Sequence, residues 1–355
     1  MRTKLTVGAV ACAVVLTACG GSDEPEAVAQ ASPAADAGEA APAAGDGEVG
    51  CPEAEGKTVG YSQPLPDPNF ALIAQVIEKG LAEHGAELVS TNANLDPGKQ
   101  LSDISSLLQQ GISVLIANPI DPNATRPVFD RARSQDIPVI AQETTVGGPF
   151  FTNVTADVEA AATQGAQLLS EAVGPGGQVA ALEGPALAEV IVRENTAFAA
   201  AAQEAGLEVV DTKVNQMITP EGARAIGDAW RQQYGADLKG IWTFNDTSAV
   251  GVASAFTGGD APTIVSINGQ PEAIPLVESG QILATFDLQQ DKIGQALAYA
   301  ALAALCDQEV PEEIVVPVTL IDSSTVGSYR PLAERVEDPF EVVLEERDGR
   351  SYVAD

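Results

Sequence analysis

Short apolar runs alternate with amphipathic stretches along the chain from Lys57 onward. Residues 114–117 and 138–141 are continuous apolar runs of strand length. Before them, Ile73, Ile77 and Leu81 recur at the spacing of one helix face. Continuous apolar strands between amphipathic helices are typical of a parallel sheet covered by helices on both faces. The pattern therefore predicts an α/β fold.

The alternation runs through the chain twice. We expect strands in the first half at 58–62, 87–89, 114–117 and 138–141, and in the second at 178–182, 208–210, 240–243, 263–267 and 282–286. The roughly 300 residues after Cys51 are too many for a typical single core. We therefore predict two successive doubly wound lobes with parallel sheets.

The N-terminus carries an export pattern. Arg2 and Lys4 precede an apolar run that ends at Leu16 and is followed by Thr-Ala-Cys. This ending resembles the bacterial lipobox, which implies that residues 1–18 are a lipoprotein signal peptide and that Cys19 carries lipid. An ordinary signal peptide is the alternative, and Cys12 is a weaker candidate anchor. We expect an extracytoplasmic protein that its lipid holds to the cell membrane.

The segment after the signal has a different composition. Residues 20–50 contain no aromatic residue, Lys or Arg, and consist mainly of small and acidic residues with Pro. Such a segment buries too little apolar surface to offset the entropy of ordering it. We interpret residues 19–56 as a disordered acidic tether.

Charge and rare residues exclude several functions. The formal net charge of −32 argues against nucleic acid, which requires a basic surface. His84 is the only histidine, so a Ser-His-Asp triad and most zinc sites are disfavoured, and we predict no metal, no cofactor and no enzyme activity. Cys51 and Cys306 remain once Cys12 and Cys19 are assigned to the signal and the anchor. In an exported protein a disulfide between them is favoured over two free thiols.

Polar residues follow the expected strands. In open parallel sheets, ligands bind beyond the carboxyl ends of strands. Those ends are rich in amides and carboxylates, which suit a polyhydroxyl ligand, although Asn and Asp also cap helices. The segments are 63–69, 118–121, 142–144, 245–246, 268–269 and 287–290.

Five short motifs in order resemble the ribose-type periplasmic sugar-binding proteins, which are the substrate-binding components of ABC importers. The resemblance covers about residues 57–319 and rests on Pro68-Asn69-Phe70, Asn118-Pro119-Ile120-Asp121, Ile137-Pro138-Val139-Ile140, Phe244-Asn245-Asp246 and Ile267-Asn268-Gly269-Gln270-Pro271. It implies two Rossmann-like lobes joined by a three-strand hinge, a type I periplasmic binding protein. The implied lobes are 57–155 with 287–318, and 156–286 with 319–325. Residues 326–355 form an extension outside the resemblance, where 340–344 and 351–353 around an Asp-Gly turn predict a hairpin.

The resemblance also implies a ligand set. Carried over by position, the candidates are Asp67, Asn69, Phe70, Asn118, Glu143, Thr144, Arg193, Met217, Asn245, Asn268 and Asp287. Phe70 could stack on a sugar or belong to the core. The family's binding arginine aligns with Glu194, and we choose the adjacent Arg193. Glu143-Thr144 replaces an Asp-Arg pair, so the pocket looks less basic than a pentose site.

These features predict a monomeric receptor that binds a neutral sugar or polyol and passes it to ABC permease subunits. A sensor lipoprotein of the same fold, which reports a sugar-like ligand to a membrane signalling partner, is the alternative. A surface glycosidase is less favoured.

Overall fold

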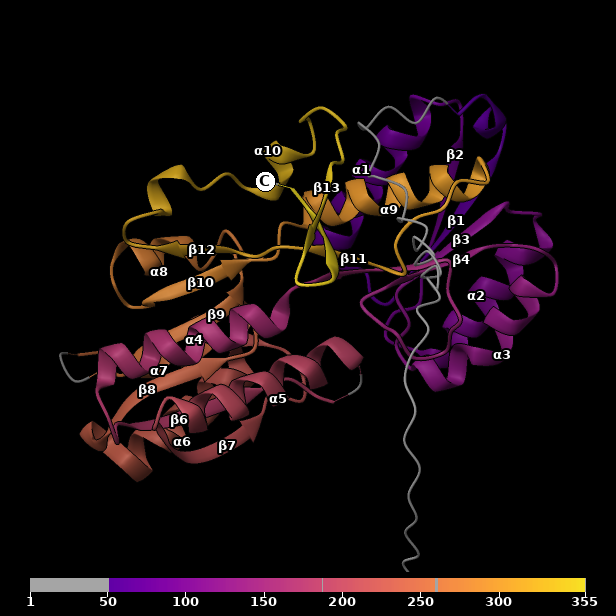
Figure 1. Cartoon of the computed structure of the whole chain (residues 1–355). Helices are drawn as coiled ribbons and strands as arrows, with labels where there is room; N and C mark the ends of the chain where they lie inside the picture. Colours follow the sequence, from indigo (N-terminus) through magenta and orange to yellow (C-terminus); the bar gives the residue numbers. More distant parts are fainter. Residues whose placement is uncertain (1–50, 187, 259–260, 355) are drawn as a thin grey trace, which may run out of the picture. The chain divides into compact units, whose positions relative to one another are not determined.

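The computed structural model describes residues 51–186, 188–258 and 261–354, and two α/β lobes can be followed in them (Figure 1). The sheet of the first lobe has the strand order β13-β14-β11-β5-β4-β3-β1-β2. Its neighbouring strands are parallel except β13 and β14. The strands are β1 (Thr58–Gln63), β2 (Glu87–Asn92), β3 (Val114–Ala117), β4 (Val139–Gln142), β5 (Thr152–Ala156), β11 (Glu313–Val316), β13 (Leu344–Arg347) and β14 (Arg350–Val353).

The sheet of the second lobe has the order β12-β10-β9-β8-β6-β7. Its neighbours are parallel except β10 and β12. The strands are β6 (Gln178–Glu183), β7 (Glu208–Val214), β8 (Leu238–Thr243), β9 (Thr263–Asn268), β10 (Ala284–Asp287) and β12 (Thr319–Asp322). The predicted pair of mostly parallel α/β lobes is confirmed.

Helices of the first lobe begin at a repeated sequence device. Asp67, Asp96 and Asp121 each precede a proline, and each side chain accepts a hydrogen bond from a backbone N–H of the first turn. Asp caps the free N–H groups, and Pro at the first position has a preset φ and no N–H to satisfy. The helices of this lobe are η1 (Pro52–Ala54), α1 (Pro68–Ala82), α2 (Pro97–Gln109), α3 (Pro122–Arg133) and α9 (Gln290–Leu305).

The second lobe contains α4 (Val158–Val173), α5 (Glu189–Glu204), α6 (Pro220–Tyr234), η2 (Gly235–Asp237), α7 (Asp246–Ala255) and α8 (Ile274–Glu278). The central strand β3 is buried along its whole length, which explains its continuous apolar sequence. None of the helices in the described parts of the chain combines the length and apolar character that crossing a membrane requires.

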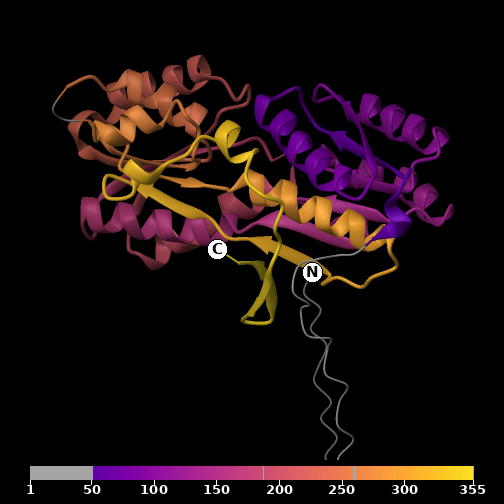
Figure 2. The same ribbon diagram turned by 90° about the horizontal axis from the view of Figure 1, so that it is seen from above.

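The chain passes between the two sheets four times. The first three crossings lie at residue 157 between β5 and α4, at 288–289 between β10 and α9, and at 317–318 between β11 and β12. The fourth runs from β12 back to β13 and β14 in the first sheet. After the second crossing, α9 packs on α1 in the first lobe, where its alanine-rich faces are buried (Figures 1 and 2).

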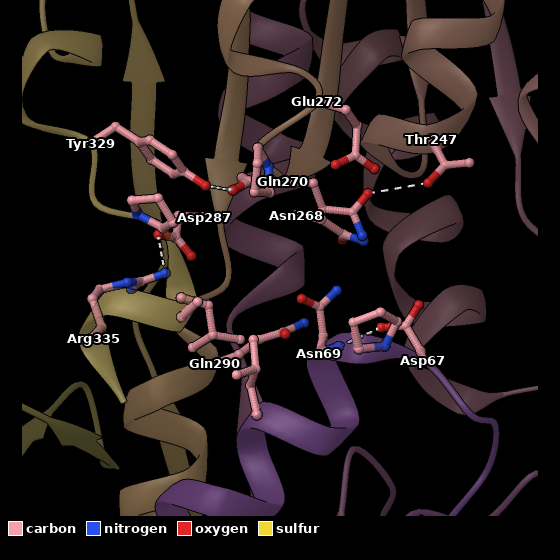
Figure 3. Close-up of a pocket in the computed structure, with 17 residues that line it drawn as sticks. Asp67, Asn69, Thr247, Asn268, Gln270, Glu272, Asp287, Gln290, Tyr329 and Arg335 are labelled. Carbon is pink, nitrogen blue, oxygen red and sulfur yellow. Dashed lines mark hydrogen bonds and ion pairs between the residues drawn. The ribbon is translucent and has the colours of Figure 1, made fainter. Parts of the chain in front are cut away.

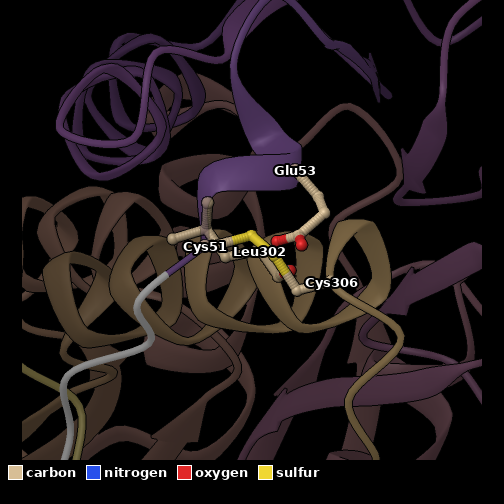
Figure 4. The surroundings of a disulfide bond; sticks show 4 residues. All are labelled: Cys51, Glu53, Leu302 and Cys306. Carbon is tan, nitrogen blue, oxygen red and sulfur yellow. Dashed lines mark hydrogen bonds between the residues drawn. A yellow bond between two sulfur atoms is a disulfide. The ribbon is translucent and has the colours of Figure 1, made fainter.

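A disulfide closes the start of the described chain onto the first lobe. Cys51 and Cys306 are bonded, with Cα atoms 5.8 Å apart (Figure 4). Cys51 precedes η1 and is buried, whereas Cys306 follows the last turn of α9. The bond therefore ties η1 to the end of α9. Residues 51–54, expected to belong to the disordered tether, are thus ordered on the first lobe, and residues 19–50 of that tether lie outside the described residues.

The C-terminal residues 326–354, here called the C-terminal strap, contact both lobes. The strap contains η3 (Val326–Ser328), α10 (Leu332–Arg335), β13 and β14, and β14 extends the first sheet beside β11. Tyr329 donates a hydrogen bond to the Gly269 carbonyl in the second lobe, at 3.0 Å. Lys79 of α1 donates to the carbonyls of Glu337 and Asp338, both at 2.9 Å. The segment that lies outside the family resemblance is thus packed against both lobes.

Arg335 in the strap forms a buried ionic cluster. Its guanidinium lies 2.8 Å from the carboxylate of Asp287 at the end of β10 and 2.6 Å from that of Asp291 on α9. All three side chains are 10–12% exposed. The cluster joins the strap to the second crossing between the lobes.

Candidate functional site

Side chains from both lobes line a cavity of about 470 Å³ at the carboxyl ends of the parallel strands. This volume lies in the usual range for small-molecule sites, which is about 300–1,000 Å³. The polar residues of the lining are Asp67, Asn69, Asn118, Gln142, Glu143, Glu194, Gln216, Asn245, Thr247, Asn268, Gln270 and Gln290.

The amides lie where strands end, because the carboxyl ends of the strands in both sheets face the cavity. Asn118 follows β3, and its chain is fixed by the Gln100 side chain, which donates to the Asn118 carbonyl at 2.8 Å. Gln142 ends β4 and accepts a hydrogen bond from the Tyr61 hydroxyl at 2.8 Å. Asn245 precedes α7, and its side-chain oxygen accepts from the Ser248 N–H at 2.9 Å. Asn245 is therefore a helix cap as well as a lining residue.

Four lining residues hold unusual backbone conformations. Their φ angles lie in the region that favours glycine: 57° at Leu95, 62° at Glu143, 51° at Ile218 and 118° at Asn268. Strained residues are often retained at binding sites, where the surrounding structure holds them in place. Of the four, Glu143 follows β4 and Asn268 ends β9, and both strands point at the cavity.

Glu143 is partly buried and hydrogen-bonded. Its carboxylate accepts from the Thr155 hydroxyl at 2.8 Å and from the Ala156 N–H at 3.1 Å. Burial raises the pKa of Glu143 to about 7, although these two hydrogen bonds oppose the shift.

Glu194 on α5 is a lining residue with a buried, unpartnered oxygen. It is 4% exposed, and its Oε1 has no hydrogen-bond partner among the described residues. Burial, and next the charge of Glu183, raise the pKa of Glu194 well above its ordinary value. Sequence reasoning aligned this position with a ligand-binding residue but chose Arg193 instead.

Arg193 does not line the cavity. Its Nε and Nη2 bind the two oxygens of Glu159 at 2.6 and 2.7 Å, and its Nη1 donates to the Thr155 hydroxyl at 3.1 Å. The bidentate pair holds the guanidinium against α4.

Thr144 and Asp287 also lie outside this lining. Thr144 is buried and bonds to Glu189. Asp287 pairs with Arg335 and lines a second cavity of about 300 Å³ (Figure 3). Six residues line both cavities: Asp67, Asn69, Thr247, Asn268, Gln270 and Gln290. The strap residues Tyr329 and Arg335 complete that second cavity.

The remaining candidates, Asp67, Asn69, Phe70, Asn118, Glu143, Met217, Asn245 and Asn268, all line the first cavity. Phe70 also packs against the first lobe's core, so both of its expected roles are compatible with its position. Met217 is 78% exposed and lies at the surface end of the lining. The sequence analysis did not single out five further polar residues that line the cavity: Gln142, Gln216, Thr247, Gln270 and Gln290. Gln142 and Gln290 fall within strand-end segments that it had marked.

One carboxylate bridges the lobes beside the cavity. Glu189, the first residue of α5 in the second lobe, accepts hydrogen bonds from residues 144–146 of the first lobe. The donors are the hydroxyls of Thr144 and Thr145 and the N–H groups of Thr145 and Val146, the last two at 2.9 and 3.2 Å. We call this contact the Glu189 bridge. It fastens the loop between β4 and β5 to the opposite lobe.

Two α/β lobes with mostly parallel sheets, four crossings between them and a shared polar cavity define a two-lobed solute-binding protein. The chain belongs to the periplasmic binding protein domain family, whose sequence profile matches residues 60–309. The predicted resemblance to periplasmic sugar-binding proteins is confirmed at this level.

Individual relatives are distant but cover most of the chain. The ribose import binding protein of Bacillus subtilis is 26% identical over 266 residues, which are 74% of this chain and 86% of that protein. A xylitol-binding protein of Mycolicibacterium smegmatis is 25% identical over 70% of this chain and 73% of its own length. Among solved structures, a periplasmic ribose ABC transporter protein from Conexibacter woesei has a TM-score of 0.73 at 22% identity, covering 81% of this chain and all of that one. A Caulobacter myo-inositol binding protein has a TM-score of 0.71 at 19% identity, covering 78% and 97% of the two chains. At these identities the structures establish the fold.

Proposed function

We propose that this protein is a lipid-anchored extracytoplasmic receptor that binds a sugar or polyol between its lobes and delivers it to an ABC importer. The observation that carries the proposal is the set of amide and carboxylate side chains from both lobes around one cavity. An amide offers donors and an acceptor together, and a carboxylate accepts from two hydroxyls, so this lining suits neighbouring hydroxyl groups. Because one ligand bonds to both halves only when the lobes are close, binding is coupled to closure.

The named relatives support the solute class and the importer role. They are named for ribose import, xylitol binding and myo-inositol binding, and each of these solutes carries several adjacent hydroxyls. The family is described by binding, which favours a receptor over an enzyme. A sensor of the same fold would use the same cavity and differ in its membrane partner. The discovery of a permease gene beside this gene would favour the importer over the sensor.

The anchor is tested at Cys19, which lies outside the described residues. We expect Cys19→Ser to move the protein from the membrane pellet to the soluble fraction, because no lipid is then attached. Immunoblots of the two fractions measure the shift. Retention of Cys19→Ser in the pellet through a lipid at Cys12 contradicts the assignment.

The cavity is tested at Asn118 and Asn245. After a thermal-shift screen of sugars and polyols has found a ligand, Asn118→Ala and Asn245→Ala should each weaken its binding about ten- to a hundredfold. Each change leaves ligand hydroxyls unpaired in a closed cleft, at a cost of about 1–3 kcal/mol. Isothermal titration calorimetry measures the affinities.

Controls separate binding from stability. Asn245→Ser retains an acceptor for the α7 cap, so it should lose affinity with less loss of stability than Asn245→Ala. Asn123→Ala removes an exposed amide on α3 and should change neither property. If both Asn118→Ala and Asn245→Ala bind like the parent protein, the cavity is not the ligand site.

A further inference from the structure

The cavity contains acidic side chains without basic ones. Asp67, Glu143 and Glu194 line it, and no Lys, Arg or His stands among its described lining residues. The nearby guanidinium of Arg193 is already occupied by both oxygens of Glu159. The charge of Arg193 still acts on Glu143, but no positive charge is assigned to Glu194, which a neutral ligand would leave without a counter-charge.

The three carboxylates differ in how well they are supported. Asp67 caps α1 by accepting from the Asn69 N–H at 2.8 Å. Glu143 accepts from Thr155 and Ala156. Glu194 has a buried oxygen without a described partner, so of the three it is the one whose missing hydrogen bond a ligand can supply.

Apolar residues line the cavity together with Glu194. Val190 and Ile191 lie one turn before it on α5, and Phe244 belongs to the same lining. An ionised carboxylate without a partner is costly in such surroundings, which agrees with the raised pKa of Glu194. A cationic donor removes that cost, and charge-assisted hydrogen bonds are about twice as strong as neutral ones.

The arrangement disfavours a metal ion as the cation. A metal site needs several His, Cys, Asp or Glu side chains whose ligand atoms lie close together. Among the described residues, such a group, with ligand atoms within 4.8 Å of one another, is formed by Cys51, Glu53 and Cys306, which lie at the disulfide and not in the cavity. The cavity carboxylates are spread instead among amides that suit hydroxyls. The cation then belongs to an organic ligand.

We propose that the ligand is an amino sugar or amino polyol whose protonated amino group is held by Glu194. The inference rests on the proposed receptor function and narrows its ligand class. It departs from the neutral solute that the sequence predicts. The hydroxyls of the ligand face the amides of both lobes, and the ammonium group donates to the unpaired Glu194 oxygen.

The test compares matched solutes on the full chain carrying Cys19→Ser. The probes are D-glucosamine, D-galactosamine and glucamine, each beside its hydroxyl counterpart D-glucose, D-galactose or sorbitol, and N-acetyl-D-glucosamine. Calorimetry should show at least one amine binding about tenfold or more tighter than its hydroxyl counterpart. N-acetylation removes the charge and should abolish that advantage.

A matched pair of variants locates the effect. Glu194→Gln keeps the shape and removes the charge, so the amine should lose about tenfold or more in affinity while the hydroxyl counterpart changes little. Glu204→Gln on the exposed end of the same helix should leave both affinities unchanged. The comparison of amine with N-acetylated probe on the parent protein remains decisive if Glu194→Gln does not fold.

The outcomes separate the two proposals. If hydroxyl probes bind as tightly as their amines, the amine inference is overturned and the receptor function stands. If amines bind more tightly but Glu194→Gln retains that preference, Glu194 is not the partner and the inference is also overturned. If none of these probes binds, the amine inference is overturned; if the screened sugars and polyols also fail to bind, the proposed receptor function is overturned with it.

Discussion

Replacing Arg335 with methionine is expected to lower the free energy of unfolding by about 3–5 kcal/mol. The change keeps an apolar stem but leaves Asp287 and Asp291 close together, largely buried and without their cation. The loss is large because removing one member of a buried ionic cluster leaves uncompensated charge. Urea denaturation followed by circular dichroism measures it.

The strap offers a matched control for this change. Arg330 lies a few residues earlier and pairs with Asp338 at 2.8 and 2.9 Å, but it is exposed. Exposed pairs contribute little, so Arg330→Met should leave the denaturation midpoint close to that of the parent. Equal losses in the two variants would show that the strap needs its positive charge rather than the buried cluster.

Removing the disulfide with Cys51→Ser and Cys306→Ser is expected to cost about 2–5 kcal/mol of unfolding free energy. The bond closes a loop with a sequence separation of 255, and a longer loop restricts the unfolded chain more. When Cys19 is replaced and the disulfide is intact, the denatured, unreduced protein should contain at most one free thiol. That thiol is Cys12, which remains only if the signal peptide is not cleaved. Thiol titration that finds both Cys51 and Cys306 free contradicts the bond.

Spectroscopy can assign the loss to a lobe. Trp230 and Trp242 are the only tryptophans in the sequence, and both lie in the second lobe, on α6 and β8. The disulfide lies in the first lobe. We expect the circular dichroism transition to move further than the tryptophan fluorescence transition, and added reductant should not alter the double variant.

The fold was predictable because local pattern and topology agree. Continuous apolar strands between amphipathic helices require a doubly covered parallel sheet, and the family resemblance supplied the crossings. The packing of the strap was less predictable from the sequence. Its Asp-Gly turn predicted the hairpin, but the pairing of β14 with β11 joins segments that no local pattern relates. The first hairpin strand also begins at Leu344 rather than at residue 340, because Phe340 packs against Gly80 of α1.

The site was predictable where the strand end itself determines the position. Asn118, Asn245 and Asn268 follow or end strands and line the cavity. The choice between Arg193 and Glu194 depended on helix rotation, since adjacent helical residues point about 100° apart. Asp287 lies outside the first cavity and pairs with Arg335, which is distant in sequence and outside the resemblance. Pairing of this kind comes from tertiary packing, which a residue pattern does not encode.

The residues of the Glu189 bridge do not line the cavity. The hydrogen bonds of the bridge add the same favourable free energy to the closed lobes whichever solute is bound, so they raise all affinities together and cancel from the ratio between two solutes. Burial alone would raise the pKa of Glu189, but the hydrogen bonds from Thr144, Thr145 and Val146 lower it below its ordinary value. A lowered pKa keeps this contribution intact above the ordinary value of 4.5, and acid removes it only below that. The receptor's selectivity therefore resides in the cavity, while the stabilisation that the Glu189 bridge adds is a separate contribution that mild acidification leaves unchanged.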